Sequence, residues 1–113
     1  MILVAEPTPF GLHDLVLAVQ TARRLQILSG VVINRSDAGD ARVREYCIEQ
    51  ALPVLLEIRE DRRVAEAYSR GEVIVDAMPI YRLVFENLWS EVSQLVQASR
   101  HMCGGTAHAD VCV

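Results

Sequence analysis

The sequence predicts an α/β domain: a three-layer fold with a mostly parallel sheet of three to four strands flanked by helices. Short, uninterrupted apolar runs alternate along the chain with segments of helical periodicity. Such runs are typical of strands buried on both faces of a parallel sheet. With 113 residues, the chain is long enough for one domain. We place that domain at residues 1–98 and expect residues 99–113, which are small, polar and glycine-containing, to form a disordered tail.

The first strand is predicted at residues 2–5, where an apolar run ends at Glu6 and Pro7. A helix over 12–25 follows, because its apolar residues recur at three- and four-residue spacing while its arginines fall largely on the other side. The strand is therefore predicted to stop at the prolines and the chain to turn back along the sheet.

The joint between this strand and helix contains groups that could do acid–base chemistry. His13 and Asp14 lie close in sequence to Glu6, but no candidate nucleophile accompanies them. They also occupy positions that suit a helix cap and first turn, where an acid is favourable. Gly11 is expected to allow the turn. We prefer this structural interpretation and assign no catalytic residue.

The remaining elements follow the same logic. Further strands are predicted where β-branched or leucine-rich runs lie between polar or proline stops: residues 30–34, 54–58 and a short extended piece at 73–75. Helices are predicted where apolar residues keep a helical spacing: 41–51, a short helix that Asp61 caps and Gly71 ends, and a last helix from Pro79. Three principal strands are few for this architecture, so we expect an open sheet edge that invites pairing with another chain.

Three polar segments follow consecutive predicted strands: residues 6–13, 34–40 and 59–61. In open parallel sheets, ligands bind beyond the carboxyl ends of the strands. The segments can therefore line one crevice, and our candidate binding residues come from them: Glu6, Pro7, Asn34, Arg35, Arg59, Glu60 and Asp61.

Asn34 and Arg35 admit two interpretations. The Asn34 amide can donate and accept hydrogen bonds at once, which suits the edge of an adenine base, and Arg35 can stack on a base or pair with a phosphate. Alternatively, Asn34 ends the strand by bonding to its own loop backbone. Spacing alone favours the second interpretation.

Composition excludes several classes of function. All 11 basic residues are arginine, so mechanisms that need a lysine, such as a Schiff base or a P-loop lysine, are excluded. The net charge of −4 implies no basic face, and we expect no nucleic-acid partner. We find neither a stretch long enough for a membrane span nor a signal peptide. We therefore expect a cytoplasmic protein.

The cysteines and histidines near the end of the chain could in principle bind zinc. His101, Cys103, His108 and Cys112 lie within twelve residues, but their spacing matches no familiar zinc pattern. We expect no metal site. With Cys47, the chain has three cysteines and no secretory signal, so we also expect no disulfide framework.

Three segments together resemble the C-terminal half of MinD/ParA-type P-loop ATPases, in particular the branch with an inserted ferredoxin-type iron–sulfur domain. They are VAEPTPFGLHDLVLAVQTARRL, GVVINRSDAGDARVREYCIEQALPVL and IREDRRVAEAYSRGEVIVDAMP, and the resemblance extends from Leu3 to Val96. It implies a partial P-loop NTPase fold. It also implies that Asn34 contacts adenine, with Arg35 beside it. The family's I-P-x-D loop reads Ile58-Arg59-Glu60-Asp61 here, so Arg59 replaces the proline.

The segments that would hold phosphate in that family, the Walker A loop with its lysines and the Mg²⁺ ligands, have no counterpart here, and neither does the iron–sulfur insert. We therefore expect at most weak ATP or ADP binding, no iron–sulfur cluster in this chain, and no hydrolysis by the chain alone. The leading hypothesis is a truncated ATPase segment that acts as a homodimer or with a separately encoded N-terminal half. The alternative is a non-catalytic interaction module that binds no nucleotide.

Overall fold

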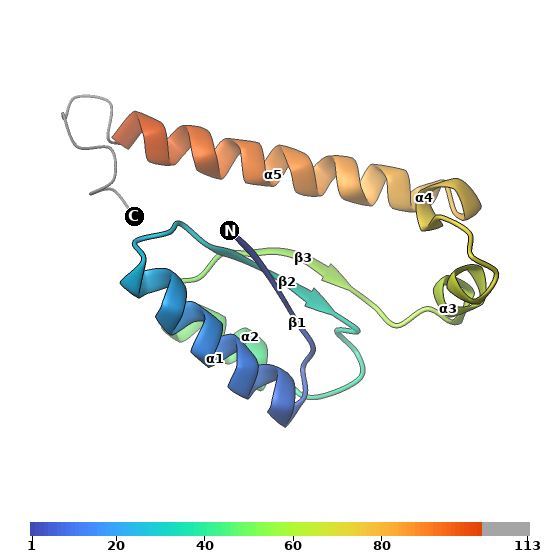
Figure 1. The fold of residues 1–113 in the computed structure, drawn as a ribbon, viewed down its shortest axis with the longest axis horizontal. Coiled ribbons are helices and arrows are strands. Elements are labelled where there is room, and N and C mark those ends of the chain that lie inside the picture. The colour runs from blue at the N-terminus through green and yellow to red at the C-terminus, as the bar shows by residue number, and fades with distance from the viewer. Residues whose placement is uncertain (103–113) are drawn as a thin grey trace.

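In a computed structural model of the chain, which describes residues 1–102, a three-stranded parallel sheet lies between two layers of helices (Figure 1). The strands are β1 (Ile2–Ala5), β2 (Gly30–Asn34) and β3 (Val54–Ile58), in the order β1-β2-β3. One face is covered by α1 (Pro9–Arg24) and α2 (Arg42–Glu49), and α5 (Ile80–Met102) lies across the other. Two short helices, α3 (Arg62–Ser69) and α4 (Ile74–Ala77), connect β3 to α5. The predicted α/β class with a parallel sheet is confirmed.

The core lies between the sheet and the α1–α2 layer. Its members are the buried residues Ala5, Leu15, Val19, Val31, Ile33, Val43 and Cys47. Only the central strand β2 is buried along four consecutive residues, Gly30 to Ile33. The opposite layer is thin, because α5 places no fully buried side chain between Ile80 and Arg100. Its apolar stripe is only partly covered.

The prediction that the outer strands are buried on both faces is wrong. In β1, Ile2 is 45% and Val4 66% exposed, whereas Ala5 on the α1 side is buried. The reason is that β1 and β3 are both edge strands and α5 packs chiefly against β3, so the α5-side face of β1 has little cover. Sequence runs alone do not distinguish an edge strand from a central one.

Helix α1 begins earlier than its periodicity predicts. Thr8 is the N-cap, and its side-chain oxygen accepts a hydrogen bond from the Gly11 amide at 3.0 Å. Pro9 is the first helical residue, where its missing N–H costs nothing. His13 and Asp14 therefore lie in the second turn, and the interpretation of either as a cap is wrong. Gly11 is inside the helix, where a Cβ would lie 2.0 Å from the Glu6 carbonyl oxygen.

The predicted caps of α3 are confirmed. The Asp61 carboxylate accepts a hydrogen bond from the Arg63 amide at 2.9 Å. Gly71 has φ of +72°, and the amides of Gly71 and Glu72 donate to the carbonyls of Tyr68 and Ala67. These bonds form a Schellman motif. The apolar spacing of this helix also predicts a buried stripe of Val64, Ala65 and Tyr68, which is wrong for Tyr68: it is 85% exposed, and Ala67 is the buried residue.

The predicted extended piece at 73–75 is also wrong. Val73 is extended, but it is the N-cap of α4, and its carbonyl accepts a hydrogen bond from the Ala77 amide at 3.0 Å. The β-branched run is too short and has no strand beside it to pair with, so a single helical turn satisfies its backbone instead. Within residues 1–102 the sheet consequently has three strands.

Two boundaries also differ. Helix α2 ends at Glu49, two residues before its predicted end, because Ala51 turns into the left-handed region with φ of 54°. Helix α5 continues to Met102, past the predicted domain end at 98. The prediction of a disordered tail falls largely on 103–113, which lie outside the described residues, as do the candidate zinc ligands Cys103, His108 and Cys112.

Candidate functional site

The carboxyl ends of the three parallel strands point the same way, and the loops that follow them meet there. Asn34, the last residue of β2, is in register with Ile58, the last residue of β3. The Ser36 amide donates to the Ile58 carbonyl at 2.9 Å, so the second loop crosses directly to the third strand. The predicted convergence of these loops is confirmed.

Arg35 connects all three loops. Its Nη2 atom donates to Glu60 Oε1 at 3.0 Å, and its Nη1 atom lies 3.8 Å from Glu6 Oε2. The backbone of Arg35 is left-handed, with φ of 52°, which turns the loop sharply at the strand end. Each of these three side chains is about half exposed. Such ion pairs orient the loops more than they stabilise the fold, since exposed pairs contribute at most about 1 kcal/mol.

Asp37 joins the second loop to the third, and the sequence analysis had not selected it. Its Oδ1 atom accepts a hydrogen bond from the Glu60 amide at 2.7 Å, and Arg59 Nε lies 3.7 Å from its Oδ2. The bond from the Glu60 amide is the main cause that holds the pKa of Asp37 below its ordinary value. The Ser-Asp-Ala-Gly turn composition was the available signal, but it indicates a turn and not the partner of the turn.

Pro7 holds the first loop against the second. It is buried, and its carbonyl accepts a hydrogen bond from the Asp40 amide at 3.3 Å. A Cβ on Gly39 would lie 1.7 Å from that carbonyl oxygen, so only glycine allows this approach. Pro7 therefore contributes its backbone carbonyl to the contact between the loops, and its ring is buried.

Asn34 uses its amide locally. Its Oδ1 atom accepts a hydrogen bond from the Arg35 amide at 3.1 Å, as the local interpretation predicted. The Nδ2 group and the second lone pair of Oδ1 stay available for another partner. Asp61, by contrast, is turned toward α3, where Arg63 is its hydrogen-bond partner and keeps its pKa low.

We call Glu6, Arg35, Asp37, Arg59 and Glu60 the strand-end cluster. It contains three carboxylates and two guanidinium groups, so its formal charge at neutral pH is negative by one. A site of this sign does not attract phosphate. It contains no serine, cysteine or lysine side chain that could act as a nucleophile.

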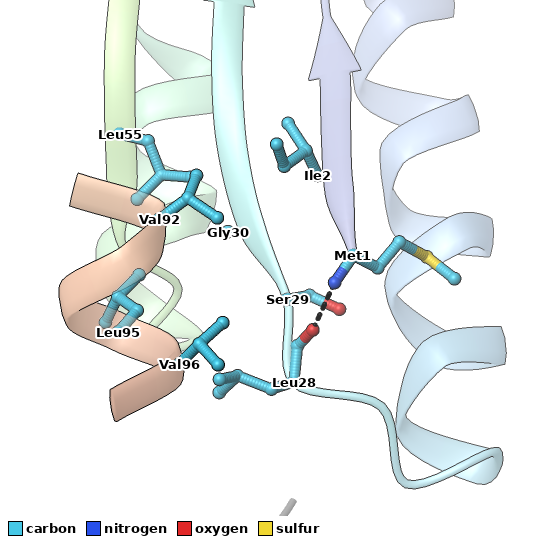
Figure 2. Close-up of a pocket in the computed structure, with 9 residues that line it drawn as sticks. All are labelled: Met1, Ile2, Leu28, Ser29, Gly30, Leu55, Val92, Leu95 and Val96. Carbon is cyan, nitrogen blue, oxygen red and sulfur yellow. Dashed lines mark hydrogen bonds between the residues drawn. The ribbon is translucent and has the colours of Figure 1, made fainter. Parts of the chain in front are cut away.

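A different pocket lies under α5 near the amino ends of the strands, opposite the strand-end cluster (Figure 2). Its lining is almost entirely apolar and includes Ile2, Leu55, Val92 and Val96. The N-terminal ammonium of Met1 donates to the Leu28 carbonyl at 2.6 Å beside it. This pocket reflects the loose packing of α5 and lacks the polar groups that orient a ligand.

No three His, Cys, Asp or Glu side chains of residues 1–102 gather closely enough to hold a metal ion. In the same range, no helix combines the length and the apolar character that crossing a membrane requires.

Comparisons with known proteins add one relative. The chain is 29% identical over 72 residues to an uncharacterized protein of Methanocaldococcus jannaschii. The alignment covers 64% of this chain and 23% of the relative, so the chain spans less than a quarter of that protein's length. No family model and no solved structure matches the chain.

Proposed function

We propose that the chain is the C-terminal half of a MinD/ParA-type ATPase domain, which retains part of an adenine-nucleotide pocket and acts in the cytoplasm through association with another chain. The observation that carries this proposal is the meeting of three post-strand loops around Arg35, with Asn34 beside it. The resemblance assigns the adenine-reading role to this asparagine. The matched segment is 23% of the relative's length, which is compatible with the proposal that this chain corresponds to one half of a larger domain.

Adenine would lie across the ends of β2 and β3. The Nδ2 group of Asn34 can donate to a ring nitrogen of adenine while the remaining Oδ1 lone pair accepts from the exocyclic amine. The exposed guanidinium groups of Arg35 and Arg59 provide planar surfaces on which a base can stack. The loop that contains Glu60 and Asp61 would lie beside the base and contact it with backbone atoms.

The chain by itself would not hydrolyse ATP. It has no lysine, the two guanidinium groups of the strand-end cluster already pair with carboxylates, and the cluster carries a net negative charge, so the phosphates meet an unfavourable field. Base binding without phosphate binding gives AMP, ADP and ATP nearly equal, millimolar affinities. The iron–sulfur domain of the related branch would belong to the other half, and this chain is not proposed to hold a cluster.

The test is an NMR titration of the full chain with adenosine, AMP, ATP and GMP. The proposal predicts that the Asn34 and Glu60 signals shift with all three adenine compounds, with similar dissociation constants, and do not shift with GMP. Asn34→Ala should abolish the shift, whereas Asn87→Ala on the exposed side of α5 should not. If millimolar adenosine and ATP leave Asn34 unchanged, nucleotide binding by this chain is ruled out.

A second candidate function is a non-catalytic interaction module without nucleotide binding. It is favoured by the hydrogen bond that already engages Asn34 and by the two carboxylates beside Arg35. In such a module the strand-end cluster would only brace the loops. The same titration discriminates the two candidates, since the module predicts unchanged spectra with every nucleotide and retained association with its partner.

A further inference from the structure

We propose that the partner is a second copy of this chain, bound through the open edge of β1 and an exposed stripe on α1 around a two-fold axis normal to the sheet. This inference names the partner for the association in the proposed function and rests on that part of it. It does not depend on nucleotide binding.

The edge of β1 is built like a pairing surface. The strand Ile2–Ala5 contains no charged residue and no proline, and its pairing with β2 has no irregularity. Since β1 lies at the end of the strand order, one row of its backbone N–H and C=O groups has no strand partner within the described residues. Natural sheets normally protect such an edge with charges, prolines or bulges.

Helix α1 extends this surface beside the strand. We call Phe10, Asp14, Leu17, Ala18, Thr21 and Leu25 the outer stripe of α1, because they recur at helical spacing on one side of it. Phe10, Asp14 and Ala18 form a groove with β1 residues Leu3 to Glu6. Phe10 is 85% and Leu17 50% exposed. The helix thus has a buried stripe toward the sheet and a second apolar stripe over the open edge.

A single two-fold axis can pass beside the middle of β1 and beside the middle of the outer stripe of α1, because these two points lie at the same position along the strand direction. Glu6 and Gly11 are level, since a Gly11 Cβ would touch the Glu6 carbonyl oxygen. From Glu6 back to Leu3 the strand covers about 10 Å, which corresponds to about six to seven residues along the antiparallel helix. Leu3 is therefore level with Leu17 and Ala18. One axis beside Leu3 also passes the middle of the outer stripe.

The strand pairing that this axis generates is self-consistent. Antiparallel pairing centred on Leu3 places Ile2 opposite Val4 of the second copy, and both side chains belong to the α5 side of the sheet. These are the two β1 residues that the monomer leaves exposed on that side. The result is a continuous six-stranded sheet in which the unpaired edge is removed.

The charges on α1 are complementary under the same symmetry. Asp14 lies in the first half of the helix and Arg24 in its last turn, and both are exposed. When Leu17 packs on Leu17 of the second copy, the antiparallel helices place Asp14 opposite Gln20 of that copy, about one helical turn from Arg24, whose long side chain can reach the Asp14 carboxylate. Opposed helix dipoles add to this attraction.

Sedimentation equilibrium of the full chain tests the inference first. The expected result is a concentration-dependent species of twice the 12.6 kDa monomer mass, with or without nucleotide. A monomer at every concentration up to submillimolar would overturn the inference, as would association that appears only when a separately encoded N-terminal half is added.

Matched variants then locate the interface. Leu17→Glu should weaken the dimer by about tenfold or more, because it places like charges against each other near the axis, and Phe10→Glu should also weaken it, because it places a charged group in an apolar contact. The controls are Tyr68→Glu and Leu83→Glu, which alter side chains of similar exposure, 85% and 58%, on α3 and α5. Circular dichroism confirms that each variant is folded. A dimer weakened only by the control variants would assign the interface elsewhere.

A charge exchange tests the symmetry itself. Asp14→Arg and Arg24→Asp should each weaken the dimer about two- to tenfold, and the double variant should restore it. Additive loss in the double variant would contradict the antiparallel arrangement. The adenosine titration repeated on monomeric Leu17→Glu separates this inference from nucleotide binding, since Asn34 should still shift there.

Discussion

The two edges of the sheet are built differently. β3 follows Pro53, carries Glu57 near its end, and has an extra residue, Leu55, in its pairing with β2. Arg44 of α2 forms an ion pair with Glu57, and α5 packs across this strand. β1 has none of these features in its four residues, and α5 reaches its α5-side face only near Ile2, so that Val4 is 66% exposed.

This difference separates a protected edge, β3, from an unprotected one, β1, at which we propose that a partner binds. A charge, a bulge and a covering helix prevent another chain from adding to β3. The apolar, regular β1 lies beside a second apolar stripe on α1, and by the same physical rule we propose it as an interface. Arg35, which follows the central strand, forms ion pairs with Glu6 and Glu60 in the loops that follow the two edge strands.

The largest expected effect on stability comes from two glycines that contact the edge strands or their loops: Gly11 beside the Glu6 backbone and Gly30 beside Leu55 of β3. Gly11→Ala should lower the free energy of unfolding by about 1–3 kcal/mol, because its Cβ would overlap the Glu6 backbone, which cannot move without moving β1. Gly30→Ala should cost less, since its Cβ meets only the flexible end of the Leu55 side chain. Urea unfolding of both variants measures the difference. Equal losses would show that the β1–α1 joint is not constrained as described.

A charge on the β1 edge should remove association without removing the fold. Val4→Lys introduces the protection that β1 lacks, and we expect the dimer to weaken by about tenfold or more. Because Val4 is mostly exposed, the stability of the monomer should change by less than about 0.5 kcal/mol. Sedimentation velocity and urea unfolding give the two values. Retention of the dimer would exclude β1 from the interface.

Removal of the charge from the β3 edge should have the reverse consequence. Glu57→Val breaks the ion pair with Arg44, which is exposed enough to contribute at most about 1 kcal/mol. It also leaves an apolar edge, and we expect new, larger assemblies in light scattering at concentrations where the parent chain forms only dimers. If the variant behaves like the parent, the bulge and α5 protect β3 without the charge.

The smallest expected effect is a pH dependence of the contact between the loops of β2 and β3. Because the Glu60 amide lowers the folded pKa of Asp37, the stability from this contact is complete above the unfolded pKa and is lost as pH falls through the folded value. An NMR pH titration should show the Glu60 amide moving with the Asp37 carboxyl at a pKa below that of a free aspartate. Asp37→Asn should abolish the movement, and a normal or raised pKa would contradict the assignment.

The strands and the α3 caps were predictable because each depends on a local pattern. The run at β2, the Asp61 cap and the Gly71 stop all follow from backbone geometry that nearby residues decide. Edge exposure was not predictable in this way, since it depends on where α5 lies. The 73–75 error has the same origin, because a β-branched run becomes a strand only beside another strand.

The site was predictable in its location and less so in its contacts. Parallel topology alone brings the segments after the strands together, and the structure confirms this for Glu6, Arg35 and Glu60. The role of Asp37 was missed because its partner, the Glu60 amide, is 23 residues away in sequence. The requirement for Gly39 was missed for a similar reason, as it depends on the distant Pro7 carbonyl.

Hydrogen exchange of the β1 amides tests the central claim most directly. If a second copy pairs with this edge, the outward amides of Ile2–Ala5 should become slower to exchange as protein concentration rises, and Leu17→Glu should remove that protection. The outer amides of β3 should not depend on concentration. Exchange at β1 that is fast at every concentration, or protection that appears at β3 instead, would contradict the account.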